Sequence, residues 1–367
     1  MTASFDREFH LQRGAALGTL NGATVVSRYD NLVAEHGFLR ETAGVLDLSF
    51  RSRICLTGSD RTRFLHGQVT NDVARLKVGE GCYAAVVNAK GKMESDLNIF
   101  QLDQELLLDF EPGLTERLVE RFNKFIIADD VQVVDVGPHY GLISVQGPKA
   151  ADVFHSLDGI LKVPDRPWQF TSTAHPALGE IVLAMHPRLG TAGFDLFVPV
   201  GQFRVAFEML VNAAGKSGGG PCGWDAFEVR RIEEGIPRFG ADMDETNLPP
   251  EAELENRAIS YSKGCYIGQE IIARIRTYGQ VAKTLRGLRF LSDCPALPGK
   301  GTPLFKETKE IGYITSAVRS LALNETIGLG YVRREANEIG TELHVRMDAG
   351  DIPVRIAPLP FTDNQPS

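Results

Sequence analysis

Residues 263–274 hold a thiol, two glycines, an amide, a carboxylate and two cations, more reactive groups than a core helix or strand needs. Gly264 and Gly268 flank the thiol of Cys265 and let the backbone turn sharply on both sides of it. The residues after Gly268 suit a helix, so Cys265 would lie just before a helix N-terminus. The helix dipole and the nearby charge of Lys263 would favour a thiolate there. This is the usual route to a reactive cysteine.

The same residues also allow a plain structural interpretation. Cys265 could be a small buried hydrophobic residue. Glu270 and Arg274 are spaced i,i+4 and could form an ordinary surface ion pair.

Asp96 is the best candidate carboxylate. It belongs to the returning strand of an expected hairpin, with strands at 83–88 and 95–100 and a turn at 89–92. Because Asp is depleted inside strands, Asp96 is either an exposed residue at the strand start or a carboxylate directed into a cavity. Four more polar residues lie at the ends or on the faces of apolar elements and could converge on that cavity, or could instead be capping and packing residues: Asn71, Tyr83, Arg231 and Glu233.

The elements that must position these groups follow from hydrophobic periodicity. Strands are expected at 45–49, 53–58, 83–88, 95–100, 105–109, 131–136, 140–148, 180–185 and 194–198. Helices are expected at 59–66, 114–125, 149–157, 202–214 and 224–235, with a flexible connection at 216–221. The strand-then-helix order recurs, which indicates two similar α+β halves. After Gly287, short β-rich pieces alternate with turns, the pattern of a small barrel or sandwich, so we place a boundary near residue 284.

Composition limits the function classes. The 367 residues carry a net charge of −8 without long runs of either sign, which argues against a broad nucleic-acid footprint or a polybasic membrane patch. The five cysteines form no C-x-x-C pair, so neither a disulfide framework nor a metal cage is expected. No segment approaches the ~20 apolar residues of a membrane span, and the N-terminus lacks the apolar core of a signal peptide. We therefore expect a cytoplasmic protein.

The string at 263–274 as a whole resembles a known signature. It matches the Lys-Gly-Cys-Tyr/Phe-x-Gly-Gln-Glu-x-x-x-Arg pattern of the YgfZ family, folate-binding proteins related to the T-protein (aminomethyltransferase) of the glycine cleavage system. Residues 120–130 also look specific to YgfZ proteins. Landmarks that resemble both T-proteins and YgfZ proteins lie at 47–49, 58, 70–73, 88–91, 96–97, 145–148 and 240–245.

The resemblance implies an α+β fold, with a ring-like arrangement of folate-binding α+β domains followed by a C-terminal β-barrel. Residues 1–283 would form the aminomethyltransferase-like, folate-binding region with two interleaved subdomains, and residues 284–367 the barrel. In T-proteins the carboxylate at the position of Asp96 contacts the reacting nitrogens of tetrahydrofolate, and it assists attack on an aminomethyl group carried by a lipoyl partner. The resemblance implies that Asp96 faces the folate, and the further folate-binding residues that we predict from their positions are Asn71, Tyr83, Arg231 and Glu233. The implied functional thiol is Cys265, supported by Lys263, Gly264, Tyr266, Gly268, Gln269, Glu270 and Arg274.

Departures from the T-protein pattern favour the YgfZ branch. T-proteins have a Thr-Gly-Tyr-Thr-Gly-Glu loop whose Glu binds the pterin, whereas residues 189–194 place Phe194 there. T-proteins also lack the thiol. One departure from YgfZ proteins is the sequence at 277–279, where that family has an aromatic residue followed by Arg-Gly.

The resemblance thus implies a tetrahydrofolate-binding protein that supports assembly or repair of iron–sulfur enzymes, with those enzymes or their assembly factors as partners. The alternative is a folate-dependent aminomethyltransferase, so the residues leave open whether the protein is an enzyme. A third possibility, a scaffold, requires no folate.

Overall fold

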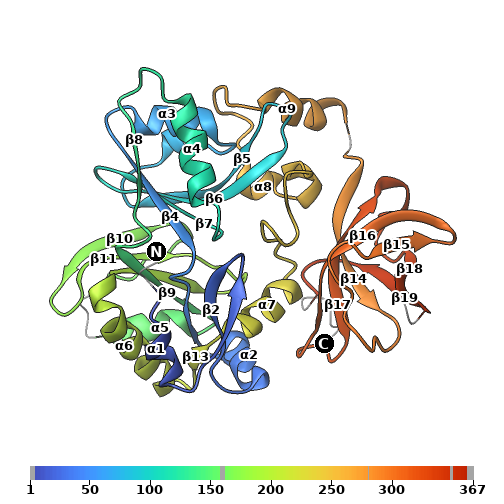
Figure 1. Ribbon diagram of the computed structural model, residues 1–367, viewed down its shortest axis with the longest axis horizontal. Coiled ribbons are helices and arrows are strands. Elements are labelled where there is room, and N and C mark those ends of the chain that lie inside the picture. Colours follow the sequence, from blue (N-terminus) through green and yellow to red (C-terminus); the bar gives the residue numbers. More distant parts are fainter. Residues whose placement is uncertain (1–4, 158–161, 280, 348–349, 362–367) are drawn as a thin grey trace. The chain divides into compact units, whose positions relative to one another are not determined.

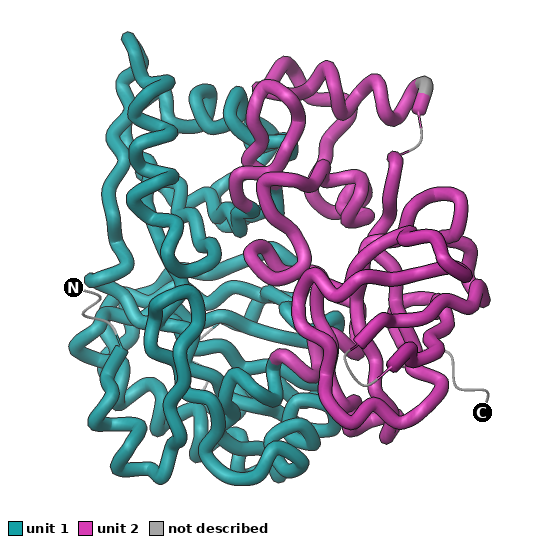
Figure 2. The backbone as a smooth tube through the Cα atoms, turned by 45° about the vertical axis from the view of Figure 1, so that its right-hand side comes forward, with its two compact units in different colours: residues 1–84, 96–227 teal, residues 85–95, 228–367 magenta. Residues whose placement is uncertain are grey.

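A computed structural model describes residues 5–157, 162–279, 281–347 and 350–361. The fold is mixed α+β with a six-stranded C-terminal β-barrel, which confirms the predicted fold class (Figure 1). Two compact units share the chain. Unit 1 comprises residues 1–84 and 96–227, and unit 2 comprises residues 85–95 and 228–367 (Figure 2). A domain boundary near residue 284 stays a prediction.

The first sheet has the strand order β5-β6-β7-β4-β8. Its strands are β4 (Ser52–Thr57), β5 (Glu80–Val87), β6 (Met93–Gln101), β7 (Leu106–Phe110) and β8 (Gln132–Asp135). The accompanying helices are α3 (Arg61–Gln68), η1 (Val73–Arg75) and α4 (Thr115–Phe125). Helix α4 buries Leu118 and Phe122, and Phe64 of α3 meets the Phe122 ring edge-on at 6.1 Å. These helices therefore cover the sheet through apolar residues at helical spacing.

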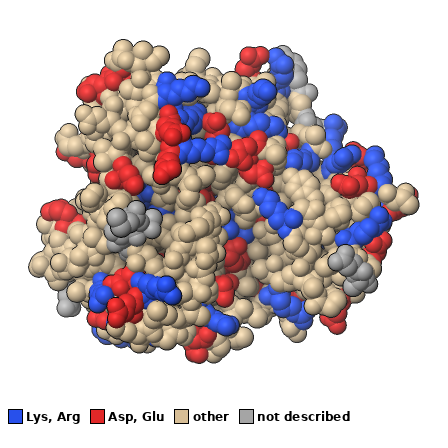
Figure 3. All heavy atoms as spheres, in the orientation of Figure 1, with Lys and Arg blue, Asp and Glu red and all other residues tan. Residues whose placement is uncertain are grey.

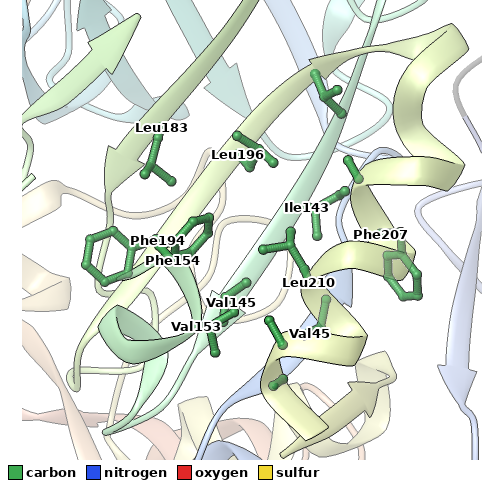
Figure 4. Close-up of a cluster of buried hydrophobic side chains, with 14 of the residues drawn as sticks. Val45, Ile143, Val145, Val153, Phe154, Leu183, Phe194, Leu196, Phe207 and Leu210 are labelled. Carbon is green, nitrogen blue, oxygen red and sulfur yellow. The ribbon is translucent and has the colours of Figure 1, made fainter. Parts of the chain in front are cut away.

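The second sheet belongs to unit 1 and has the order β10-β11-β12-β9-β3-β13. Its strands are β3 (Gly44–Asp47), β9 (Tyr140–Gln146), β10 (Phe170–His175), β11 (Gly179–Met185), β12 (Gly193–Pro199) and β13 (Gly220–Cys222). Helices α5 (Ala150–His155) and α6 (Phe203–Lys216) pack on one face of the sheet, and the 3₁₀ turn η2 (Val200–Gln202) precedes α6. Figure 4 shows the buried side chains of this layer, among them Phe154, Phe207 and Leu210.

The predicted flexible connection at 216–221 is wrong. Helix α6 ends at Lys216, and β13 follows as a short strand that pairs in parallel with β3. The glycines serve close packing, because a Cβ on Gly219 would lie 2.1 Å from the carbonyl oxygen of Ala43. Other elements without a matching prediction include α1 (Arg7–Leu11), β1 (Ala16–Leu20), β2 (Ala23–Arg28) and β10. Helix α2 (Leu32–Glu41) lies between β2 and β3.

The longer segment of unit 2 begins within α7 (Trp224–Glu233) and continues through η3 (Pro249–Ala252), α8 (Glu255–Ala258) and α9 (Gln269–Tyr278). The closed barrel follows in the order β14-β17-β16-β15-β18-β19. Its strands are β14 (Lys283–Phe290), β15 (Pro303–Lys306), β16 (Lys309–Arg319), β17 (Thr326–Arg333), β18 (Glu342–Met347) and β19 (Gly350–Ala357), with the 3₁₀ turn η4 (Arg334–Ala336) between β17 and β18. The β-rich pieces expected after Gly287, at 288–291, 310–317, 326–332, 342–347 and 352–356, correspond to five of these strands, and β15 was not predicted.

Two general properties bear on partners. In the part of the chain that the structure describes, no helix is long and apolar enough to cross a membrane. On the face shown in Figure 3, basic and acidic side chains are interspersed, without a field of one sign.

Candidate functional site

Three of the predicted site residues meet in unit 1. The Tyr83 hydroxyl in β5 donates a 2.8 Å hydrogen bond to Oδ2 of Asp96 in β6. The side-chain amide of Asn71 donates to the backbone carbonyl of Tyr83, also at 2.8 Å. Asp96 is only partly buried. It is thus not the exposed strand-start residue of the first alternative, and its direction into a ligand cavity stays a prediction.

Trp168 extends this group and was not predicted. Its ring stacks with that of Tyr83 at 6.5 Å between centroids and lies 4.7 Å from the His186 ring. The backbone of Trp168 has φ +68°, a left-handed conformation that costs free energy for a large side chain. The only sequence signal was a tryptophan directly after Pro167. The fold holds this ring in a strained position beside Tyr83.

The electrostatic surroundings tune Asp96. Loss of water around the carboxylate and the negative charge of Glu111 raise its pKa to about 6, and the Tyr83 hydroxyl and Arg51 only partly oppose that rise. A carboxyl group with a pKa close to neutral can both accept and return a proton under physiological conditions. That property is typical of functional carboxylates.

A buried ion network in unit 1 includes these charges. Arg51 donates to Asp109 at 2.9 Å and to Glu111 at 2.5 Å. Arg188 joins Asp109 at 2.9 Å to Asp195 at 2.7 Å. Although burial alone would raise it, the charge of Arg188 and the hydrogen bonds from Arg188 and His186 lower the pKa of Asp195 to about 2. Every carboxylate in this network has a cationic partner, which fixes the charges around the Asp96 group.

His186 connects the network to the aromatic rings. Its Nδ1 lies 2.7 Å from Oδ2 of Asp195, and the ring contacts Trp168. Burial and the charge of Arg188 lower the pKa of His186, so the ring is neutral at physiological pH. We interpret His186 as a support for Trp168.

Arg231 and Glu233 lie in unit 2, where both side chains are buried. Arg231 uses all its guanidinium nitrogens: it forms bidentate bonds with Glu228, a 2.7 Å bond with Asp242, and bonds to Ile236 and Ser316.

Glu233 accepts hydrogen bonds from Arg230, Ser320 and the Ala322 N–H. These bonds hold α7 and the barrel strands together within unit 2. A role of Arg231 or Glu233 toward folate stays a prediction.

The thiol of Cys265 is exposed, so the alternative of a buried hydrophobic residue is wrong. Helix α9 begins at Gln269, as predicted, with Gly268 as its N-cap residue. Lys263 is largely buried, and its ammonium group lies 4.8 Å from the Tyr266 ring centroid. Among the residues that the structure describes, no three His, Cys, Asp or Glu side chains are grouped to hold a metal ion.

Two further residues of the string behave as a plain surface pair. Glu270 and Arg274 form a 2.9 Å ion pair with both side chains more than half exposed. Their task in positioning the cysteine loop stays a prediction, as does that of Gly264.

Gly268 packs the cysteine loop against the 88–92 turn inside unit 2. Its φ is +81°, and a Cβ there would lie 2.4 Å from the carbonyl oxygen of Asn88. We expect Gly268→Ala to destabilise the protein by about 2–4 kcal/mol, because backbone strain and a backbone clash add. Denaturant unfolding measures this.

Gly215→Ala in α6 is the matched control. A Cβ there meets nothing within 4 Å, so a change of at most about 1 kcal/mol is expected. Equal stability of the Gly268 and Gly215 variants would contradict the packing argument.

Two family models together match most of the chain. The GCVT N-terminal domain matches residues 7–263, and the glycine cleavage T-protein C-terminal barrel domain matches residues 283–363. The chain belongs to the glycine cleavage T-protein family.

Relatives and a solved structure agree with this T-protein family membership. An aminomethyltransferase from Desulforamulus reducens is 26% identical and covers 96% of this chain and 95% of its own length. An aminomethyltransferase from Rubrobacter xylanophilus is 29% identical, and the alignment covers 96% of this chain and 92% of that protein. The crystal structure of glycine cleavage system aminomethyltransferase T from Bartonella henselae has a TM-score of 0.86 over 98% and 97% of the two chains at 24% identity, which shows the shared fold. None of these matches distinguishes the YgfZ branch.

Phe194 marks where this member of the T-protein family departs from the pattern stated above. Its side chain is 1% exposed and packs on Phe154 at 5.4 Å, in the layer under α5 and α6 (Figure 4). Strand alternation places the next residue, Asp195, on the opposite face, within the ion network. A carboxylate at 194 in this backbone would therefore enter the hydrophobic core.

Proposed function

We propose that the protein binds tetrahydrofolate in unit 1 and that Asp96 is the residue that engages it. The observation that supports this is the Asp96–Tyr83 pair beside the Trp168 ring. Tetrahydrofolate has a bicyclic head with a planar pyrimidine ring and several N–H donors, and it carries an aromatic substituent. A carboxylate that accepts hydrogen bonds, a phenol and aromatic faces for stacking are groups that fit such a molecule.

The residues of the chain would act by holding and moving a proton. Oδ2 of Asp96 accepts a hydrogen bond from the Tyr83 hydroxyl, and this bond fixes the orientation of the carboxylate. The carboxylate would accept N–H groups of the ligand, and its pKa of about 6 lets it take up a proton at neutral pH. The bound folate would supply the nitrogen that carries a one-carbon unit.

Calorimetric titration with tetrahydrofolate tests the proposal. We expect saturable binding to the wild type and a loss of at least about tenfold in affinity for Asp96→Ala, because a charge-assisted hydrogen bond contributes about 1.5–3 kcal/mol. Asp103→Ala in the exposed β6–β7 turn is the matched control and should bind like the wild type. No binding to the wild type would favour a scaffold that needs no folate.

We further propose that the protein belongs to the YgfZ branch and supports assembly or repair of iron–sulfur enzymes through Cys265. The exposed thiol on a loop held by Gly268, and the core position of Phe194, support this proposal.

Cys265→Ala should leave unfolding within about 0.5 kcal/mol of the wild type, because the side chain is exposed. It should also abolish rescue of iron–sulfur enzyme activity in cells that lack the gene. Cys294→Ala, another non-disulfide cysteine, is the control and should rescue fully. Full rescue by Cys265→Ala would remove the thiol from the mechanism.

The second candidate is a folate-dependent aminomethyltransferase. The relatives of that name, aligned over nearly the whole chain, favour it over the first candidate. Turnover of an aminomethylated lipoyl carrier with tetrahydrofolate, independent of Cys265, would establish it. Binding of tetrahydrofolate without turnover would support the YgfZ branch.

A further inference from the structure

Arg53 in β4 is a buried cation that forms no ion pair with a carboxylate of the described part of the chain. Its Nη2 donates to the carbonyl oxygens of Ser49 and Gly137 at 3.2 Å and of Tyr140 at 2.6 Å. Among the residues that the structure describes, its Nε and Nη1 have no hydrogen-bond partner, so three of the five N–H groups are unpaired there. Unpaired buried charge is costly, and burial lowers the pKa of Arg53 to about 10 because nearby carboxylates do not offset the loss of water. Such a group calls for a ligand or a water.

A cavity of about 140 Å³ lies against Arg53, between the two sheets of unit 1. On the first sheet, strand alternation places Arg53 and Cys55 on one face, and Cys55 pairs in register with Leu107. On the second sheet, Val182 lies opposite Ser172 on one side and Phe197 on the other. All these residues line the cavity, and most of its remaining wall is apolar.

The charged residues that line the cavity differ in their burial. Arg53 is 0% exposed, whereas Glu180 is exposed and Glu105 half-buried, and both glutamates line the same cavity. A cation thus lies at the buried end and two carboxylates lie toward solvent. A plain anion would pass the glutamates at a cost, but a molecule with an ammonium group beside its carboxylate would complement both ends.

We propose that this cavity binds a small zwitterionic amino acid with an apolar side chain. Its carboxylate would accept the unpaired N–H groups of Arg53, its ammonium group would face Glu105 and Glu180, and its side chain would contact Leu107 and Phe197. A cavity of about 150 Å³ holds a benzene-sized molecule. The size therefore corresponds to alanine through valine.

Titration of the full-length protein with L-alanine, followed by ligand-observed NMR and calorimetry, tests the proposal. We expect saturable binding of L-alanine, with propionate, which lacks the ammonium group, and ethylamine, which lacks the carboxylate, at least about tenfold weaker. Absence of L-alanine and L-valine binding would overturn the proposal. Equal binding of propionate and L-alanine would overturn the zwitterion assignment.

Two kinds of variant locate the site. Val182→Phe leaves Arg53 in place but fills the cavity from the second sheet and should abolish binding, whereas Val205→Phe, on the exposed side of α6, should retain it. Glu105→Gln should reduce the preference for L-alanine over propionate at least about threefold. Arg53→Lys should weaken L-alanine binding at least about tenfold. If that variant does not fold, the Val182→Phe variant still tests whether the ligand binds in this cavity. Unchanged binding in folded Val182→Phe would place the ligand elsewhere and refute the proposal.

Discussion

Asp96→Asn should stabilise the folded protein by about 1–3 kcal/mol at pH 7.5 while weakening tetrahydrofolate at least about tenfold. The carboxyl pKa is raised from 3.8 to about 6, so ionisation of Asp96 destabilises the folded state relative to the unfolded chain. A pKa change of this size corresponds to at most about 3 kcal/mol, and to less here because the side chain is partly exposed. Asparagine removes this charge and can still bond the Tyr83 hydroxyl.

The pH dependence gives this prediction its sign. A carboxyl group with a raised pKa binds its proton more tightly in the folded state, so stability falls as the pH rises from about 4 to about 6 and stays low above that. The advantage of Asp96→Asn should therefore be complete at pH 7.5 and mostly gone near pH 4. Denaturant unfolding of the wild type and the variant at both pH values measures it.

Asp103→Asn, at an exposed position, should show no such dependence. An equal gain at both pH values would mean that the charge of Asp96 is not its source. Wild-type affinity for tetrahydrofolate should fall by up to about tenfold per pH unit below pH 6, because the acceptor is then protonated. The weaker binding of Asp96→Asn should not vary in this range.

Arg231→Ala should destabilise the protein by about 3–5 kcal/mol, the usual cost of removing one partner of a buried ion pair. Asp242 would remain buried with only neutral donors, the hydroxyls of Thr315 and Ser316 and the Arg238 N–H, and Glu228 would lose its bidentate partner. Thermal or denaturant unfolding measures the loss. Arg274→Ala, which breaks an exposed pair, should change stability by less than about 1 kcal/mol and serves as the control.

Arg231→Lys separates structure from ligand binding. It keeps the charge but loses the planar fork, so an intermediate loss of stability is expected. Because every guanidinium nitrogen of Arg231 is engaged in unit 2, tetrahydrofolate affinity should not change at temperatures where the variant is folded. A lower affinity under those conditions would give Arg231 the folate-binding role that the family resemblance implies.

Local patterns predicted most of the elements. Alternation and turn chemistry located the hairpin that carries Asp96, and the glycines around Cys265 located the start of α9. The link between Asp96 and Tyr83 was within reach because both residues lie in one hairpin. Periodicity failed for the edge strand β10 and for β13, whose Gly and Pro residues are typical of loops.

The ion network was not predictable from local patterns. Arg51, Asp109 and Arg188 are separated by about 60 to 80 residues, and only the register of two different sheets brings them together. Trp168 likewise contacts the ring of His186, which follows it by 18 residues in the sequence, and no local pattern predicts that contact. For Arg231, type and spacing indicated a functional arginine, but only the fold shows that its donors are all used.

The 85–95 turn belongs to unit 2, although the rest of that unit starts at residue 228. Within this unit the Met93 N–H donates to the carbonyl oxygen of Asn247, and Gly91 packs closely against Ile271. On the ribosome these partners emerge about 150 residues after the turn, which at 5–20 residues per second is a delay of roughly 8–30 s. The turn is therefore an early-synthesised segment that completes its contacts last, and nascent chains stalled before residue 247 should expose it to protease.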